Sequence, residues 1–224
     1  MPMATIRSNS RPASAARKRR APGRPPANGP ELRPRLLDAA LACYVRVGIA
    51  ATSLRAIARE AGVTPALLHY YFGDASQLRQ AVVDERVLPA IATLRARLVF
   101  DGAPAEIATG FVDAVAELVA SHPWLPALWV REILCEGGGL RDLLRQFVSP
   151  LPQALAARFA QAQRQGALNA ALDPRLLVVS LIGLTLFPAA GAPLWRETFR
   201  AGDVDAAALR AHTLALLGGG LGGT

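Results

Sequence analysis

The stretch TPALLHYYFGD, residues 64–74, places a histidine and three aromatic rings together in a chain whose aromatic content is only 6 %. On a helix, which turns by about 100° per residue, these positions separate into two faces. One face carries small residues followed by two hydrogen-bonding rings: Pro65, Ala66, His69 and Tyr70. The other face is apolar with aromatic ends and contains Leu68, Tyr71 and Phe72, with Leu67 near the boundary. The apolar face is expected to pack on neighbouring helices.

The small face suits recognition of nucleic acid. Small residues let the first turn of a helix approach base edges in the major groove, where the Ala66 methyl or the Pro65 ring can touch a thymine methyl. One turn later, His69 and Tyr70 can reach phosphate oxygens, which a helix N-terminus also attracts. The alternative is that His69 and Tyr70 are exposed rings covering a seam between helices, and periodicity alone leaves both interpretations open.

Nothing in the sequence indicates catalysis. The three histidines, His69, His122 and His212, are scattered, and we find no nucleophile–base spacing, phosphate loop or cluster of metal ligands. The two cysteines, Cys43 and Cys135, lie far apart and are expected to be buried, reduced thiols. The sequence therefore predicts a protein that is not an enzyme and that needs no cofactor or metal.

The positive charge is concentrated in one arm. Residues 1–35 hold nine of the 25 basic residues against one acid, which accounts for the whole net charge of +8, and the remaining chain is balanced. Residues 1–29 are rich in Pro, Ser, Ala and Arg and are expected to be disordered. Their segment RKRRAPGRPP resembles the minor-groove AT-hook, but Pro22 replaces its first Arg, so a general phosphate-binding arm is favoured. A basic arm on a neutral body indicates a nucleic-acid partner.

Helical periodicity begins at residue 30 and predicts an all-α fold. A first helix ends at Gly48, a second follows a cap at Ser53 or Thr52, and a third begins at a Thr64 cap with Pro65 in its first turn. Gly73 ends the third helix, and Asp74 caps a fourth that Pro89 ends or kinks. Two short helices joined by a tight glycine turn, residues 53–72, form a helix-turn-helix unit.

The rest of the chain is also predicted to be helical. Helices are expected near 104–121, 124–136, 139–165, 174–187 and 203–217, with a flexible tail at 218–224. The uncharged run 176–195 has the length of a membrane span, but Pro188, Gly191 and Pro193 break its second half. We therefore predict a buried core or interface helix there and no membrane segment. With no signal sequence visible, a cytoplasmic location is expected.

The run TSLRAIAREAGVTPALLHYYFGDASQL resembles the helix-turn-helix of TetR-type (TetR/AcrR) transcriptional regulators. The matching positions are Thr52, Ile57, Ala58, Ala61, Gly62, Val63, Thr64, Leu68, Tyr71, Phe72 and Leu78. The chain departs from that pattern with Ala66 for Gly, Leu67 for a DNA-contacting Thr, His69 for Tyr and Ala75 for Lys. The basic arm, Arg55 and Arg59 are expected to compensate for the cation missing at position 75.

The resemblance implies a sequence-specific regulator, a ligand-responsive repressor that binds a palindromic operator as a homodimer. The implied DNA-contacting residues are Thr52, Ser53, Arg55, Thr64, Pro65, Ala66, Leu67, His69 and Tyr70. It implies a DNA-binding domain at 30–90 and, at 91–217, a helical domain that binds an effector and pairs subunits through the helices near 174–187 and 203–217. Candidate walls of the effector pocket are Phe111, Trp124, Trp129, Phe147, Phe187 and Trp195. The alternative function is a non-specific architectural DNA-binding protein driven by the basic arm.

Overall fold

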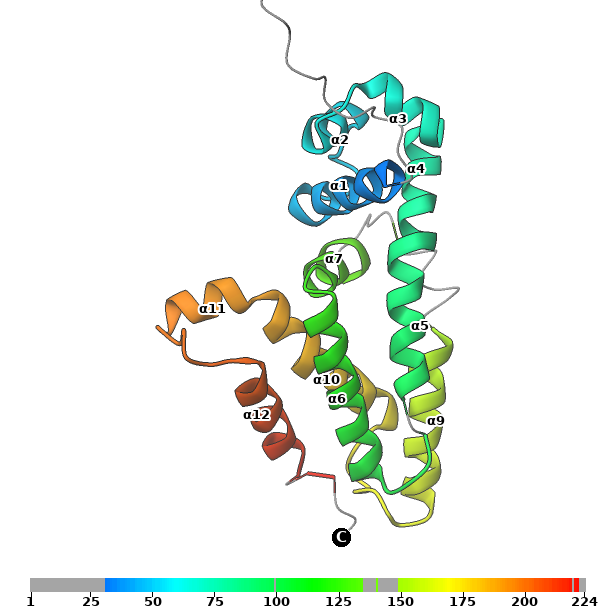
Figure 1. The fold of residues 1–224 in the computed structure, drawn as a ribbon. Coiled ribbons are helices and arrows are strands. Elements are labelled where there is room, and N and C mark those ends of the chain that lie inside the picture. The colour runs from blue at the N-terminus through cyan, green and yellow to red at the C-terminus, as the bar shows by residue number, and fades with distance from the viewer. Residues whose placement is uncertain (1–30, 99, 135–139, 141–148, 219, 222–224) are drawn as a thin grey trace, which may run out of the picture.

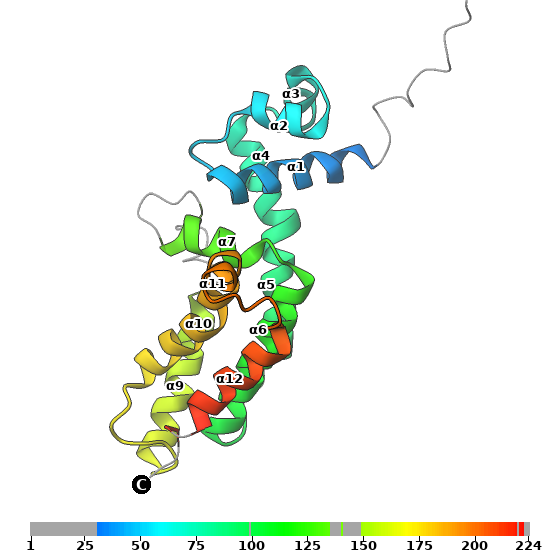
Figure 2. The ribbon, with the colours of Figure 1, turned by 90° about the vertical axis from the view of Figure 1, so that its left-hand side faces the viewer.

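The structure is a computed structural model that describes residues 31–98, 100–134, 140, 149–218 and 220–221. Within those residues every regular element is helical, which confirms the all-α prediction. The predicted arm at 1–29, Cys135, Phe147 and most of the predicted tail lie outside the described residues. The molecule is elongated, with the N-terminal helices gathered at one end (Figures 1 and 2).

Four helices form the N-terminal end: α1 (Leu32–Val47), α2 (Leu54–Ala61), α3 (Pro65–Phe72) and α4 (Ala75–Val82). Local caps explain two of their boundaries, because Ser53 Oγ accepts from Ala56 N at 3.2 Å and Asp74 Oδ1 accepts from Gln77 N at 2.8 Å. Gly62 takes the left-handed conformation, with φ of +67°, between α2 and α3. Thr64 is the N-cap residue of α3, but its side chain makes no capping hydrogen bond.

The fourth helix does not end at Pro89. A five-residue π-helical segment, η1 (Val83–Val87), carries α4 into α5 (Leu88–Arg97), so that one long helix runs between the two ends of the molecule (Figure 1). Proline has no N–H, and so the carbonyl of Glu85, four residues earlier, cannot receive its usual helical donor. Arg86 Nη1 donates to that carbonyl at 3.0 Å. A side chain thus replaces the lost backbone donor, and the helix continues.

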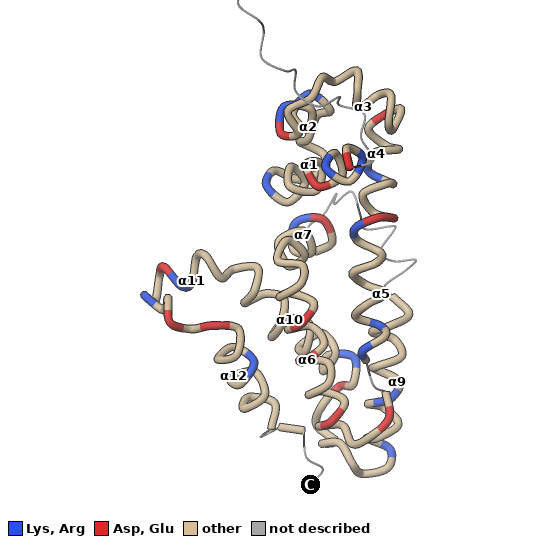
Figure 3. The backbone as a smooth tube through the Cα atoms, in the orientation of Figure 1, with Lys and Arg blue, Asp and Glu red and all other residues tan. Residues whose placement is uncertain are grey.

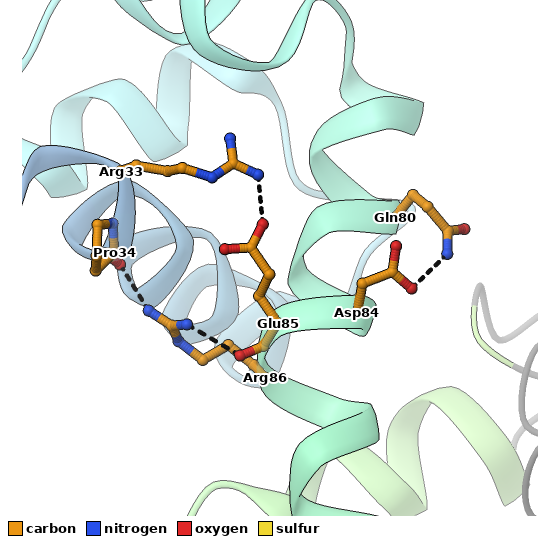
Figure 4. A network of polar contacts seen from close by, with 6 residues as sticks. All are labelled: Arg33, Pro34, Gln80, Asp84, Glu85 and Arg86. Atoms are coloured by element: carbon orange, nitrogen blue, oxygen red, sulfur yellow. Dashed lines mark hydrogen bonds and ion pairs between the residues drawn. The ribbon is translucent and has the colours of Figure 1, made fainter. Parts of the chain in front are cut away.

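The same guanidinium joins this helix to α1. Arg86 Nη2 donates to the carbonyl of Pro34 at 3.1 Å, and Nε donates to Asp38 Oδ1 at 2.7 Å. Close by, Arg33 forms an ion pair with Glu85 (Figure 4). The π-helical segment is therefore held against α1 by polar contacts on two successive turns of that helix.

The other end of the molecule contains α6 (Pro104–Ser121), α9 (Pro150–Arg164), α10 (Pro174–Ala190) and α12 (Ala206–Gly218), with α11 (Ala192–Thr198) projecting to one side (Figure 1). Between the two ends lie α7 (Leu125–Trp129) and a second π-helical segment, η2 (Val130–Leu134). The predicted helix at 139–165 lies partly outside the described residues.

The prediction that Pro188 ends the helix expected at 174–187 is wrong. The short helix α11 was not predicted. α10 continues through Pro188 to Ala190. The carbonyl deprived of its donor is that of Leu184, and Thr213 Oγ1 of α12 lies 3.4 Å from it. No single described helix is long and apolar enough to span a membrane, whereas α10 and α11 together, bent by 71°, pass on length and composition.

Buried side chains form two clusters that meet between α5 and α7. The upper core joins α1–α4 and η1 and also includes Ile91 of α5, Leu128 of α7 and Leu140. The lower core is built mainly from α6, α9 and α10. Trp124 packs against both. The predicted boundary at residue 90 therefore does not divide the cores cleanly, since Leu128 and Leu140 belong to the upper one.

Replacing Arg86 tests whether its guanidinium supports the proline-interrupted helix. We expect Arg86→Met to lower the free energy of unfolding by about 1–2 kcal/mol, because the carbonyls of Glu85 and Pro34 lose a donor. In a Pro89→Ala background, where residue 89 regains an N–H, the same change should cost less. Urea denaturation of the four proteins of this double-mutant cycle measures the difference.

Arg95→Met, at an exposed site on α5, is the matched control and should change stability by less than about 0.5 kcal/mol. An equal cost of Arg86→Met with and without Pro89 would show that Arg86 does not act through the Glu85 carbonyl.

Candidate DNA-reading surface and apolar pocket

The exposure of α3 follows the predicted division of its rings. Leu68 and Phe72 are buried in the upper core, and Tyr71 is half-buried against it. On the other face Thr64, Pro65, Ala66 and His69 are exposed, and Tyr70 is 81 % exposed. Leu67, at the boundary, is half-buried and packs on the upper core, so its side chain is only partly available to a partner.

Contacts from the preceding turn and from Arg33 of α1 fix α3 in place. Val63 in the turn is half-buried against the upper core, and its N–H donates to the carbonyl of Ala58 at 2.9 Å. The Arg33 guanidinium stacks over the Phe72 ring, 4.7 Å from its centroid. Tyr70 packs edge-to-face on Tyr71 with ring centroids 5.5 Å apart. The exposed residues are thus displayed by a helix whose other side is anchored.

The hydrogen bond of His69 changes what this residue can offer. Nδ1 lies 2.6 Å from the carbonyl of Gly73, and a carbonyl only accepts, so Nδ1 carries the proton. In the neutral ring Nε2 then has a lone pair and no hydrogen. Donation from Nε2 to a phosphate therefore requires the imidazolium, a condition that the sequence does not reveal.

Two of the predicted DNA-contacting residues, Thr52 and Ser53, make hydrogen bonds between α1 and the start of α2. Thr52 is half-buried, and its Oγ1 donates to the carbonyl of Gly48 at 2.6 Å, while Ser53 caps α2. Arg55 and Arg59 on α2 are exposed. Ala75 is exposed at the first position of α4. Thr52 and Ser53 therefore set the start of α2 whatever else they contact.

No residue of α3 carries a formal charge, and the helix is drawn entirely in the neutral colour in Figure 3. Basic residues nearby lie on α1, α2 and α4. Attraction to phosphates at this end of the molecule must therefore come from elements other than α3 itself.

The carboxylate of Glu132, in η2, contacts the turn between α1 and α2. Glu132 of η2 is only 3 % exposed, and its Oε1 accepts from the backbone N–H of Ile49 at 2.9 Å. Gly48 has φ of +88°, and a Cβ there would lie 3.2 Å from the same oxygen. A residue with a side chain at position 48 would be strained by its backbone and crowded by Glu132.

Burial in the upper core keeps two ionisable side chains of α1 in their uncharged forms. Burial raises the pKa of Tyr44 to about 12 and raises the pKa of the Cys43 thiol. Cys43 is buried and is not in a disulfide, as expected. Both side chains are therefore packing groups at neutral pH.

An apolar pocket lies where the two cores meet. Its cavity volume is about 80 Å³, below the roughly 300–1,000 Å³ of most small-molecule sites, so its walls must move apart to admit a larger molecule. Every described residue of its wall has an aliphatic or aromatic side chain: Val87, Ile91, Leu94, Phe111, Val115, Leu118, Trp124, Leu125, Leu128, Trp129, Ile133, Leu140, Leu151, Pro152, Leu155, Val178, Ile182 and Leu186.

Three of the predicted wall residues, Phe111, Trp124 and Trp129, line this pocket. Phe187 does not, because it lies on the outer face of α10 and is 68 % exposed. Trp195 also lies elsewhere, on α11, where its Nε1 donates to the carbonyl of Pro188 at 2.8 Å. Most of the wall consists of Leu, Ile and Val from helices distant in sequence, which no local pattern distinguishes from ordinary core.

Several large apolar side chains remain exposed on α10, α11 and α12. The side of the molecule that carries these helices faces the viewer in Figure 2. Leu176, Val179 and Phe187 are each more than 60 % exposed and recur on one face of α10, and Leu216 of α12 is also largely exposed. α11 adds exposed Leu194 and Phe199. Contiguous exposed apolar residues are more typical of protein–protein contact sites than of the remaining surface of a soluble protein.

The sequence of this chain is similar to those of known transcriptional regulators. The family described as bacterial regulatory proteins, tetR family, matches residues 36–82. The transcriptional regulator BetI of Serratia proteamaculans is 31 % identical over 144 residues, which cover 57 % of this chain and 72 % of that protein. SrpR of Pseudomonas putida is 38 % identical over 63 residues, covering 28 % of this chain and 30 % of that regulator.

Solved structures agree in fold. The ketosteroid transcriptional regulator KstR2 of Mycobacterium tuberculosis superposes with a TM-score of 0.69 at 20 % identity, covering 88 % of this chain and 98 % of that one. FadR of Bacillus subtilis, solved with stearoyl-CoA, gives a TM-score of 0.59 at 18 % identity, covering 82 % and 96 %. With α2 and α3 matched by the family pattern and BetI aligned well beyond them, this chain belongs to the tetR family of DNA-binding transcriptional regulators.

Proposed function

We propose that this protein is a ligand-responsive repressor that binds a palindromic operator as a homodimer. The observation that carries the proposal is the joint placement of an exposed, anchored α3 and an apolar pocket at the boundary with the lower core. A recognition surface alone fits any DNA-binding module, whereas a pocket walled by both cores fits one whose DNA affinity a small molecule controls.

The proposed reading head uses α3 in the major groove. Pro65 and Ala66 approach the bases and supply apolar contacts, while Tyr70 and protonated His69 contact phosphates. Arg55 of α2 and the basic residues of the arm supply the charge that α3 lacks. Thr64 stands at the start of α3 with its side chain exposed and available to DNA. Leu67 contributes through its exposed part.

The proposed dimer pairs α10 and α12 with the same helices of a second copy. The exposed residues of α10 recur at helical spacing, as a self-complementary helix pairing requires. A twofold axis through this face would present two α3 helices to successive major grooves, and palindromic operators have that symmetry. The interface proposed from sequence, 174–187 and 203–217, lies largely within these two helices.

The proposed effector site is the apolar pocket. Two of the similar structures are those of a ketosteroid regulator and of a regulator bound to stearoyl-CoA. The steroid skeleton of the first ligand class and the stearoyl chain of the second ligand are apolar, whereas coenzyme A is highly charged. Occupation of the pocket in this chain is proposed to favour an arrangement of the two cores that releases the operator.

Footprinting on the DNA that flanks the gene of this protein tests the central proposal. A protected palindrome is expected, and deleting residues 1–29 should weaken binding while leaving the same bases protected. The dependence of log affinity on log salt should become shallower by roughly one to three units, because fewer counterions are released.

An architectural protein would behave differently in the same measurement. Its binding would vanish with the arm, and the full chain would show no preferred site. That pair of results would replace the repressor proposal by the architectural one.

Removing the ring nitrogens of His69 tests its proposed contact with DNA. Nδ1 is engaged by the carbonyl of Gly73, so the proposed contact uses Nε2. We expect His69→Phe to weaken operator binding by roughly three- to tenfold per subunit, the size expected for the loss of one exposed phosphate contact.

Fluorescence anisotropy with a labelled operator at fixed salt measures the dissociation constants of the wild-type protein and the variant. Equal dissociation constants would identify His69 as a residue that only closes the end of α3.

A further inference from the structure

The chemistry of the pocket wall restricts what it can hold. Charged side chains on the helices around it are engaged away from the pocket. Glu117 of α6 pairs with Arg97, and Asp113 of α6 pairs with Arg210. Arg158 of α9 donates to the carbonyl of Phe100 at 2.6 Å. Among the described residues, the wall therefore offers no ion to neutralise a charged ligand.

Two tryptophans carry the only polar side-chain atoms among the described wall residues, and neither exposes its indole nitrogen to the pocket. The indole nitrogen of Trp129 is buried and has no acceptor among the described residues. A buried N–H without an acceptor is unfavourable, and an uncharged oxygen on a ligand could relieve it after a modest shift of the ring. The wall thus tolerates one neutral oxygen, whereas a carboxylate or an ammonium ion would lose its hydration without compensation.

We propose that the pocket binds an uncharged, predominantly apolar molecule that carries at most a hydroxyl or carbonyl oxygen, and that it discriminates against carboxylates and quaternary ammonium ions. The inference rests on the proposed role of the pocket as the effector site. It excludes ligands whose charged group must enter the pocket, and it requires the apolar body of the ligand to touch both cores.

Three decyl compounds of equal chain length test the ligand class: 1-decanol below its solubility limit, and decanoate and decyltrimethylammonium below their critical micelle concentrations. Titration of the full chain is followed by tryptophan fluorescence, because Trp124 and Trp129 line the pocket. We expect 1-decanol to bind at least about tenfold more tightly than either ion. Ile182→Phe, which adds volume to the wall, should weaken 1-decanol about tenfold, whereas Ala157→Phe on exposed α9 surface should not.

The possible results distinguish a failure of the proposed ligand class from a failure of the proposed repressor function. Equal or tighter binding of an ion, or no binding of 1-decanol, overturns the ligand class. An ion that binds in the pocket and releases the operator would leave the repressor function intact with a different ligand. Tight binding of 1-decanol without any change in operator affinity would keep the ligand class and reject the effector role.

A separate observation concerns how the pocket communicates with the DNA-reading end. Trp129 and Ile133 line the pocket, and Glu132 between them turns away to accept the N–H of Ile49. The turn that Glu132 holds also contains the bond from Thr52 Oγ1 to Gly48 O at 2.6 Å. Any displacement of this short segment by a ligand therefore pulls on the turn that sets the start of α2.

We infer that Glu132 is a positioning residue that links pocket occupancy to the reading head. It does not line the pocket, and it contacts the α1–α2 turn by a buried, charge-assisted hydrogen bond. Because α2 packs against α3, a change at Ile49 reaches the recognition helix through one intervening helix. The ligand thus needs no contact with α3 to alter its placement.

The coupling factor, which is the operator dissociation constant with a saturating probe divided by that without it, measures this role. The probe is whichever decyl compound binds tightest. Glu132→Gln keeps an acceptor oxygen and should retain most of the coupling. Glu132→Leu removes it and should bring the factor to within about twofold of one, with probe affinity changed less than about threefold.

A purely structural Glu132 would give a different pattern, because Glu132→Leu would then weaken operator binding equally with and without probe and leave the factor unchanged. Amide hydrogen exchange of Ile49 in the wild-type protein gives a test that needs no variant. Saturation with the probe should accelerate exchange at Ile49 more than at Val63, whose N–H bonds to Ala58 within the reading head. Equal protection of Ile49 with and without probe overturns the inference.

Discussion

The arrangement of this molecule depends on one helix that continues across a proline. α4, η1 and α5 connect the end that carries α3 with the end that carries the pocket, and Pro89 removes a backbone donor in the middle of that connection. Arg86 supplies the missing donor to Glu85 and, with the same guanidinium, holds α1. The continuity of the long helix and the placement of α1 therefore depend on the same side chain. Val87 and Ile91, on either side of Pro89, then take their places in both the upper core and the pocket wall.

The uncharged α3 divides affinity from selectivity. A helix that ends in two rings and begins with Pro and Ala can discriminate by shape and apolar contact, but it contributes little attraction to a polyanion. The basic arm, residues 1–29, carries +7 of the net charge of +8, while the rest of the chain is nearly balanced. In the proposed function, charge brings the protein to DNA and the exposed face of α3 selects the site. His69 stands between the two roles, because its hydrogen bond to Gly73 makes its contribution conditional on protonation.

Local sequence predicts those features whose causes are local. Ser53 and Asp74 cap the helices that follow them, and the two faces of α3 are separated by helical periodicity alone. The passage of α10 through Pro188 was not predictable in this way, because the hydroxyl that approaches the deprived carbonyl belongs to Thr213, in another helix. Phe187 was misplaced for a related reason: aromatic character indicates burial but does not say which face of a helix is covered. The pocket likewise joins Ile91, Leu128 and Leu140, whose common membership in one core is a property of tertiary packing.

Because both cores wall the pocket, a ligand that binds there can shift the equilibrium between different arrangements of the two cores. Filling the space favours the arrangement whose walls fit the ligand, and it can shift the equilibrium only by the difference between its affinities for the two arrangements. Since Ile91 and Leu128 belong to the core that supports α3, any change in their spacing from α6 and α10 changes the pocket and the reading head together. Linkage then requires that operator binding alter ligand affinity by the same factor. A wholly apolar wall serves this purpose well, because dispersion and burial act at every contact and respond to small changes in spacing.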